Sequence, residues 1–367
     1  MKYCLLAFTV FVESFVLAYL LVPLVIRIAE RFNVVDKPGA RKVHRTSKPL
    51  LGGVAIFSGF FFVLVINIFA FASFHQQEKV LQFLPSAPRL FEHLIRVLPQ
   101  LLIILLGGVM MHLLGLVDDI YKEKLTYKPK FLIQFAIALF VTLAGIRTNL
   151  MPGTALDVAV SVFWIIGITN SFNLLDNLDG LTAGVTVIAA LIFIAVAILQ
   201  GQIFIALILA ALAGAAAGFW PHNFHPSRLF MGDSGSLFIG YMFGVLTVLE
   251  SYVVESSASL LPVVMPILIL SIPLYDTLSV MLIRLREKRP LFIGDKRHFS
   301  HRLLDLGMNH RETVVFIYLI CFGVGLAATL LPYVTLAGSL VLVIQALIVY
   351  ALITILIRVG KRRTKAS

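Results

Sequence analysis

The sequence is poor in charge and in cysteine. Only 13% of its 367 residues are Asp, Glu, Lys or Arg, whereas 59% are hydrophobic. A soluble globular chain is roughly one quarter charged, so a soluble protein is not expected. The two cysteines, Cys4 and Cys321, lie in separate apolar runs and match no metal-binding spacing, which argues against a disulfide framework or a thiolate metal site. No internal repeat is visible, and this weakens the case for an inverted-repeat transporter.

Long apolar runs dominate the chain instead. A membrane-spanning helix needs roughly 20 apolar residues, and we therefore predict an all-α integral membrane protein with about eleven transmembrane helices. One polytopic domain is expected over residues 1–357, followed by a basic tail at 358–367. The first run lacks a small-residue cleavage site, so we expect a retained span and not a signal peptide. The predicted spans are 4–29, 50–74, 97–117, 131–147, 154–175, 180–200, 203–220, 236–254, 260–283, 313–332 and 334–357.

Lys and Arg are divided unevenly between the two sets of loops. Of the 30 Lys and Arg residues, 25 fall in the odd-numbered loops and the tail: 27–48, 122–130, 221–235, 284–311 and 358–367. The positive-inside rule places this side in the cytoplasm, the N-terminus outside and the C-terminus inside. Anchoring against anionic lipid headgroups explains any one of these basic residues taken alone.

The polar motifs fall on the same predicted cytoplasmic face, and the outer loops carry no comparable cluster. This asymmetry suggests chemistry at the inner surface on a cytosolic substrate, whereas a transporter would place such groups near mid-membrane. The motifs are "DKPGARKVHRTSKPLLGG" (36–53), "GLVDDIYKEKLTYKPK" (115–130), "TNSFNLLDNLDG" (169–180), "PHNFHPSRLFMGDSGS" (221–236) and "RLREKRPLFIGDKRHFSHRLLDLGMNHRE" (284–312).

Acidic and amide side chains in these motifs are candidates for chemistry. Asp118 and Asp119 form an adjacent pair at a span end, which is either a solvated helix terminus or a pair that binds Mg²⁺ or accepts a proton. Asn173, Asp176 and Asp179 are spaced by three, so on a helix they would share one face. Helix capping accounts for one of them but not for all.

Asp233 stands between glycines in "MGDSGS", where the backbone can approach an anion closely. Hard oxygen ligands from two loops, Asn173 or Asp176 together with Asp233, suit Mg²⁺.

Basic side chains in the same loops are candidates for binding phosphate: Arg41, Lys42, His44, Lys128 and Lys130. His298, His301 and Arg302 could bind a phosphate or a sugar. Zinc is the alternative for the two histidines, but no Cys accompanies them and their spacing is not that of a helical zinc motif.

The order of these motifs resembles that of the bacterial polyprenyl-phosphate N-acetylhexosamine-1-phosphate transferases (WecA/TagO-like enzymes), which are related to the MraY translocases and to the eukaryotic dolichyl-phosphate enzyme. The resemblance runs from about residue 36 to residue 312. It rests on "RKVH" with "PLLGG", "GLVDD" with "KLTYKPKFLIQ", "NSFNLLDNLDGL", "NFHPSRLFMGDSGS" and "DKRHFSHRLL".

The resemblance implies transfer of N-acetylhexosamine-1-phosphate, most simply GlcNAc-1-phosphate, from a UDP-sugar to a polyprenyl phosphate such as undecaprenyl phosphate, with release of UMP. The lipid-linked product would initiate cell-envelope polysaccharide synthesis at the bacterial cytoplasmic membrane. Mg²⁺ is the implied cofactor and Mn²⁺ its substitute. Nucleic acid is not an expected partner, and a homodimer is left open.

The resemblance also assigns roles by position. One of Asp118 and Asp119 would activate the lipid phosphate, and Asn173 and Asp233 would bind Mg²⁺. The remaining assignments put Asp176 and Asp179 at the nucleotide end, Asn223 and Phe230 at uracil, Lys128 and Lys130 near the phosphates, and His298 and His301 in a His-x-His-His loop.

Two positions depart from the family pattern. Ser300 replaces the middle histidine of that loop, and Asn177 stands where glycine is usual. Ser300→His is expected to leave the reaction type unchanged, and to raise the rate if an imidazole at this place normally helps. Two other functions stay open: a flippase or transporter for an anionic lipid, and a translocase with a muramyl-pentapeptide donor.

Overall fold

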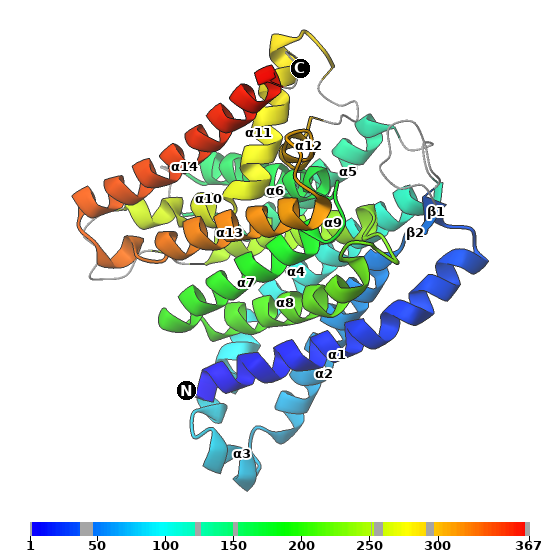
Figure 1. Ribbon diagram of the computed structural model, residues 1–367. Coiled ribbons are helices and arrows are strands. Elements are labelled where there is room, and N and C mark those ends of the chain that lie inside the picture. The colour runs from blue at the N-terminus through cyan, green and yellow to red at the C-terminus, as the bar shows by residue number, and fades with distance from the viewer. Residues whose placement is uncertain are drawn as a thin grey trace.

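The computed structural model describes residues 2–36, 47–121, 126–149, 153–250, 252, 260–290 and 297–363. Over these ranges the chain is all-α apart from one antiparallel pair of short strands, β1 (Val35–Asp36) and β2 (Lys48–Pro49) (Figure 1), so the predicted class is confirmed. The helices are α1 (Lys2–Arg31), α2 (Gly52–Phe74), α3 (Glu78–Phe83), α4 (Ala87–Tyr121), α5 (Tyr127–Leu143), α6 (Thr154–Leu175), α7 (Leu181–Leu199), α8 (Ile203–Asn223), α9 (Asp233–Leu249), α10 (Met265–Ile269), α11 (Ser271–Arg286), α12 (Phe299–Leu304), α13 (His310–Ala328) and α14 (Leu336–Arg363), with 3₁₀ turns η1 (Leu261–Val264) and η2 (Leu331–Tyr333).

The described part of the chain has the helices of a polytopic membrane protein. Eight helices are long and apolar enough to cross a membrane, and a ninth span results if the consecutive helices η1–α10 and α11, bent by 75° at their break, count as one. The segments predicted at 131–147 and 236–254 are α5 and α9, and each has 17 residues. These two are shorter than the roughly 20 residues of a full crossing.

The two ends of the bundle carry different features. The start of α1 lies beside α3 (Figure 1), where the Tyr3 and Ser86 hydroxyls are 3.2 Å apart. The strand pair and α12 lie toward the opposite end of the molecule (Figure 1). The described parts of the first and last polar motifs therefore lie toward the end away from the N-terminus.

Helix α9 occupies the centre of the bundle. Every residue from Ser234 to Thr247 is buried, as expected of a helix that is apolar on all sides. It packs against α4 and α6, and its Gly240 and Gly244 are spaced to let α6 approach closely. A Cβ on Gly240 would lie 2.7 Å from the Thr169 Cα. This packing fixes the first residues of α9 at the polar end of the bundle.

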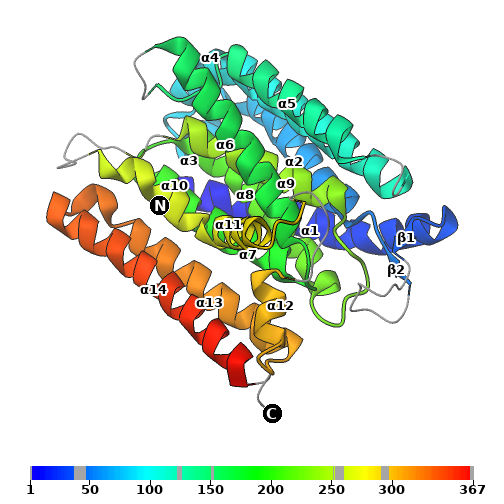
Figure 2. The same cartoon turned by 90° about the horizontal axis from the view of Figure 1, so that it is seen from above.

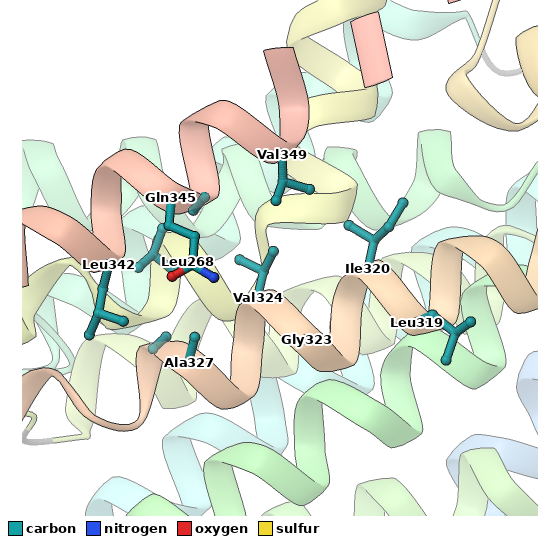
Figure 3. Close-up of a pocket in the computed structure, with 11 residues that line it drawn as sticks. Leu268, Leu319, Ile320, Gly323, Val324, Ala327, Leu342, Gln345 and Val349 are labelled. Carbon is teal, nitrogen blue, oxygen red and sulfur yellow. The ribbon is translucent and has the colours of Figure 1, made fainter. Parts of the chain in front are cut away.

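Helices α13 and α14 lie on the flank opposite α4 and α5 (Figure 2). Between α10, α13 and α14 lies a largely apolar cavity of about 240 Å³, lined by residues that include Leu268, Val324, Leu342 and Gln345 (Figure 3). None of its lining residues belongs to the polar motifs. The cavity is therefore separate from the candidate site.

Candidate active site

The first and fourth polar motifs are joined by their backbones. Gly52 N–H donates to the Phe230 carbonyl at 2.9 Å, and Gly53 N–H donates to the Met231 carbonyl at 2.8 Å. A Cβ on Gly53 would lie 2.1 Å from the nitrogen of Gly235. The glycine pair of "PLLGG" is thus needed because two stretches of main chain meet here without room for a side chain.

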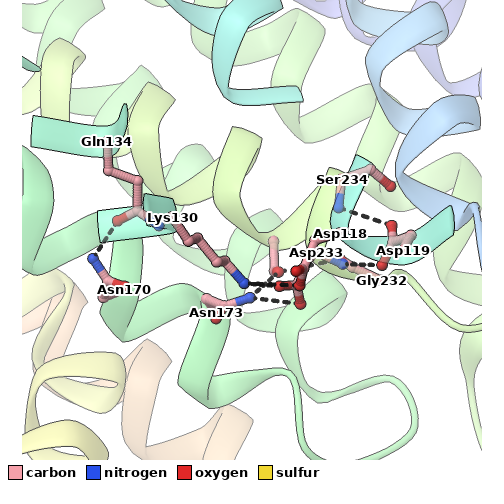
Figure 4. A network of polar contacts seen from close by, with 10 residues as sticks. Asp118, Asp119, Lys130, Gln134, Asn170, Asn173, Gly232, Asp233 and Ser234 are labelled. Carbon is pink, nitrogen blue, oxygen red and sulfur yellow. Dashed lines mark hydrogen bonds and ion pairs between the residues drawn. The ribbon is translucent and has the colours of Figure 1, made fainter. Parts of the chain in front are cut away.

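A cluster of charged and amide groups lies at the N-terminus of α9 (Figure 4). The Lys130 ammonium donates to Asp118 Oδ2 at 3.1 Å and also to Asp233 Oδ2. Asn173 Nδ2 donates to Asp233 Oδ1 and to Ser236 Oγ, each at 2.9 Å. Three polar motifs therefore contribute to one cluster.

Asp119 faces a different set of partners from Asp118. Its carboxylate accepts the backbone N–H groups of Asp233 at 2.8 Å and Ser234 at 3.0 Å, and its residue is only 6% exposed. Gly232, with φ at 74°, leaves no room for a Cβ, which would lie 2.5 Å from Asp119 Oδ2. Asp119 thus satisfies two of the free N–H groups at the start of α9, where a negative charge is also favoured by the helix dipole.

The third motif does not continue as a helix. Helix α6 ends at Leu175, and Asp176 has φ −76° and ψ 58°. The condition under which Asn173, Asp176 and Asp179 would share one helical face is therefore not met, because only Asn173 lies on the helix, which ends where the predicted span 154–175 ends. Burial raises the pKa of the Asp176 carboxyl to about 7, and nearby Asp233 adds to this by repulsion.

Asp179 and Asn223 hold the third and fourth motifs together. Asp179 Oδ2 lies 2.9 Å from His225 Nδ1 and accepts the Ser227 N–H at 3.1 Å. Asn223 is 3% exposed, and its side chain joins two main-chain groups. It accepts from Gly180 N–H at 3.0 Å and donates to the Leu229 carbonyl at 2.9 Å. Both side chains therefore shape the loops around the site.

The predicted histidines lie at the start of α12: His298 directly precedes the helix, and His301 lies within it. His298 is 5% exposed, and its Nδ1 lies 2.7 Å from Asp276 Oδ2 on α11. The ring centroids of His298 and His301 are 6.3 Å apart. Arg302 turns back toward α11, where it donates to Ser279 Oγ and lies 6.0 Å from the Tyr275 ring centroid.

The predicted basic residues are separated by the structure. Lys130 lies in the carboxylate cluster, whereas Lys128, at the start of α5, is exposed. Arg41, Lys42 and His44 belong to 37–46, which lies outside the described residues.

Asp276 is a candidate site residue that the sequence analysis did not single out. It is 1% exposed and also accepts the N–H of Phe299, so it anchors both His298 and the start of α12. The signal was a lone carboxylate within the apolar run "SIPLYDTLSV". Ionisable residues in such runs are commonly functional.

The groups in this cluster that could bind a metal are the carboxylates of Asp118 and Asp233 and the amide of Asn173, whose Nδ2 faces Asp233 here. Within the described ranges, no group of three or more His, Cys, Asp or Glu side chains has the arrangement of a metal site. Two carboxylates, Asp118 and Asp233, nevertheless converge on one cation, the Lys130 ammonium, and Asn173 adds an amide. Carboxylate and amide oxygens are suited to a hard cation such as Mg²⁺, which keeps phosphate or water as its other ligands.

Comparison with known proteins bears on this site. Residues 101–251 match the model of glycosyl transferase family 4. The chain is 33% identical to the probable undecaprenyl-phosphate N-acetylglucosaminyl 1-phosphate transferase of Bacillus subtilis, over 91% of this chain and 87% of the relative. It is 30% identical to the decaprenyl-phosphate N-acetylglucosaminephosphotransferase of Mycolicibacterium smegmatis, over 91% and 84%. A phospho-N-acetylmuramoyl-pentapeptide-transferase of Staphylococcus saprophyticus is 26% identical over 67% and 75%. The resemblance seen in the motifs is confirmed, and the chain belongs to glycosyl transferase family 4.

Proposed function

We propose that this protein transfers N-acetylglucosamine-1-phosphate from UDP-N-acetylglucosamine to a polyprenyl phosphate and releases UMP. The observation that carries the proposal is the cluster of Asp118, Lys130, Asn173 and Asp233, formed by three polar motifs in a chain of this family. The lipid-linked product would begin the assembly of a cell-envelope polysaccharide. The family assignment leaves no support for a flippase or transporter.

The reaction brings together two anions that repel each other, and the cluster contains a positive charge that can offset this repulsion. An oxygen of the lipid phosphate attacks the β-phosphorus of the donor, the bond from that phosphorus to the bridging oxygen breaks, and UMP leaves. Positioning and charge neutralisation provide most of the catalysis in phosphoryl transfer. Lys130 offers a fixed positive charge beside Asp118, while Asp119 is occupied at the start of α9. We therefore assign to Asp118 the acceptance of any proton left on the lipid phosphate.

Asn173 and Asp233 are the proposed Mg²⁺ ligands, and Mn²⁺ is the expected substitute. When bound there, the ion would neutralise part of the pyrophosphate charge. The backbone of Asp233 is held by its N–H bond to Asp119, and its carboxylate accepts hydrogen bonds from Lys130 and Asn173.

The nucleotide end is proposed to lie between the third and fourth motifs. Asp176 and Asp179 belong to the third motif, and the Phe230 ring, in the fourth motif, is proposed to stack on uracil. Asn223 bonds both Gly180 and Leu229, so its role is to hold the wall of this pocket. His298 and His301 are proposed to meet the sugar pyrophosphate.

The test is a UMP-release assay with purified protein, polyprenyl phosphate, Mg²⁺ and a panel of UDP-sugars. We expect turnover with UDP-N-acetylglucosamine and little with UDP-glucose or the muramyl-pentapeptide nucleotide, because a site built on hydrogen bonds rejects donors that lack the partner group. If the muramyl-pentapeptide nucleotide is the best donor, the assignment to the N-acetylhexosamine-1-phosphate transferases, and not to the translocases, is wrong. If no donor yields UMP, the transferase proposal fails.

The bundle is proposed to cross the membrane eleven times, with α5 and α9 as short crossings, the N-terminus outside and the polar motifs in the cytoplasm. The excess of Lys and Arg at the polar end supports this orientation. In a Cys4→Ser background, a cysteine at Gln77 should react with an impermeant reagent from outside, and one at Lys288 should not. The reverse labelling pattern would overturn the orientation.

A further inference from the structure

The two positions at which the sequence departs from its family are in contact. Ser300, on α12, donates its hydroxyl hydrogen to Asn177 Oδ1. Asn177 in turn donates through Nδ2 to the Leu174 carbonyl at 2.8 Å, at the end of α6. Ser300 is 1% exposed. A buried hydroxyl and a side-chain amide thus connect α12 to the loop that follows α6.

This contact links two groups of proposed site residues. Asn177 directly follows Asp176, and Ser300 stands between His298 and His301. At its start α12 is held by Asp276, which bonds both His298 and the Phe299 N–H. That anchor fixes α12 to α11 but not to the third motif. The bond from Ser300 to Asn177 supplies the connection to the third motif.

We propose that Ser300 and Asn177 act as one positioning unit, which sets the placement of the α12 histidines relative to the nucleotide end of the donor site. The inference rests on the proposed function, since that function puts a UDP-sugar between these elements. Neither residue is assigned contact with the reacting atoms.

The two side chains are expected to depend on each other. Ser and Asn together have the same number of side-chain heavy atoms as His and Gly, the residues usual in the family at these places. Ser300→His alone would press an imidazole against Asn177 in a closely packed site. Asn177→Gly alone would leave the Ser300 hydroxyl buried without its acceptor, which is costly. The double change restores the total side-chain volume and should therefore recover activity. Because Ser300→His alone crowds the site, we expect it to lower the rate and not to raise it.

The test is a double-mutant cycle on the full-length protein. The kcat and KM for UDP-N-acetylglucosamine are measured for the parent, Ser300→His, Asn177→Gly and the double variant. Residues in contact couple by about 0.5–3 kcal/mol, so each single variant should lose about tenfold in kcat/KM, which corresponds to 1.4 kcal/mol. The double variant should recover most of that loss. Ser300→Thr, which keeps the hydroxyl, should retain more activity than Ser300→Ala.

Ser271→Ala is the matched control, because it removes another hydroxyl contact, the 2.6 Å contact with Tyr350 that joins α11 to α14. Its kcat/KM should stay near that of the parent. If the losses of Ser300→His and Asn177→Gly multiply in the double variant, the inference is wrong. Absence of UMP release by the parent would instead overturn the proposed function. If Ser300→His does not fold, the cycle of Ser300→Ala with Asn177→Ala decides, and there the second change should add little to the first.

Discussion

Asp118 and Asp119 are neighbours in the sequence, yet their carboxylates face different partners. Asp118 accepts a hydrogen bond from the Lys130 ammonium, whereas Asp119 accepts two backbone N–H groups at the start of α9. One carboxylate therefore belongs to the charged cluster and the other holds a helix end. The division follows from the close approach of α4 to α9, since a Cβ on Gly115 would lie 2.3 Å from the Asp233 carbonyl oxygen.

Substitution of the two aspartates should separate these roles. Asp118→Asn should lower kcat by about 100-fold or more, the scale of a lost general base, with little change in thermal stability. Asp119→Ala should lower both, because loss of a helix cap costs about 0.5–2 kcal/mol. The measurements are UMP release and the apparent Tm in detergent. An Asp119→Ala variant with the Tm of the parent would contradict the capping role.

Lys130 should matter more than its neighbour Lys128 on the same helix. Lys130→Met removes the cation between two carboxylates, leaving Asp118 and Asp233 to repel each other, and should lower kcat by about 100-fold, as expected for loss of a fixed charge at the reacting phosphates. Lys128→Met, at an exposed position, should have a far smaller effect. The comparison is made by UMP release at saturating donor. Equal losses in kcat would mean that both lysines act only through the overall positive charge at the polar end of the bundle, and not through a specific contact of Lys130.

Much of the fold could be predicted from the sequence, because apolar runs of span length identify helices almost alone. Each predicted span coincides with a helix or a consecutive bent helix pair. The limits of α4 were missed: the prediction began at residue 97, but the helix starts at Ala87. Its first turns include charged residues such as Arg89 and Glu92. These residues are compatible with a helix, but a prediction based on apolar runs leaves them outside the span.

The site was less predictable, since proximity in space depends on packing. The motifs identified Asp118, Lys130, Asn173 and Asp233, but nothing in their spacing shows that Asp119 turns away. Asp276 was missed because its partner His298 lies 22 residues further along the chain. The end of α6 at Leu175 matches the predicted span 154–175, but a spacing of three fits a helix and a turn alike and so could not show how Asp176 and Asp179 are placed.

The stability of the protein should depend on pH through Asp176. The pKa of this carboxyl is raised from 3.8 to about 7 by burial, so the folded protein holds the proton more tightly than the unfolded chain does. Ionisation therefore costs stability, and the cost grows as pH rises from about 4 to about 7 and is constant above. Asp176→Asn should raise the apparent Tm at pH 8 by about 2–4 °C and have less effect at pH 5. The exposed Asp305→Asn controls for loss of a carboxylate. If the difference in apparent Tm between Asp176→Asn and the parent becomes smaller as pH rises, the predicted direction of the pH dependence is wrong.

Asp276 is expected to act through His298. Asp276→Asn keeps the size of the side chain but weakens its hold on the ring and on the Phe299 N–H. Loss of a partner that orients a metal-bound histidine typically costs 10- to 100-fold, and we expect kcat to fall by a comparable factor when the partner of His298 is lost. The decisive measurement is the double variant with His298→Asn. If Asp276 works only by orienting His298, the double variant is no slower than His298→Asn alone, whereas independent roles would multiply the losses. Asp157→Asn, a buried carboxylate that bonds Thr148, is the control for disturbing a buried acid away from the site.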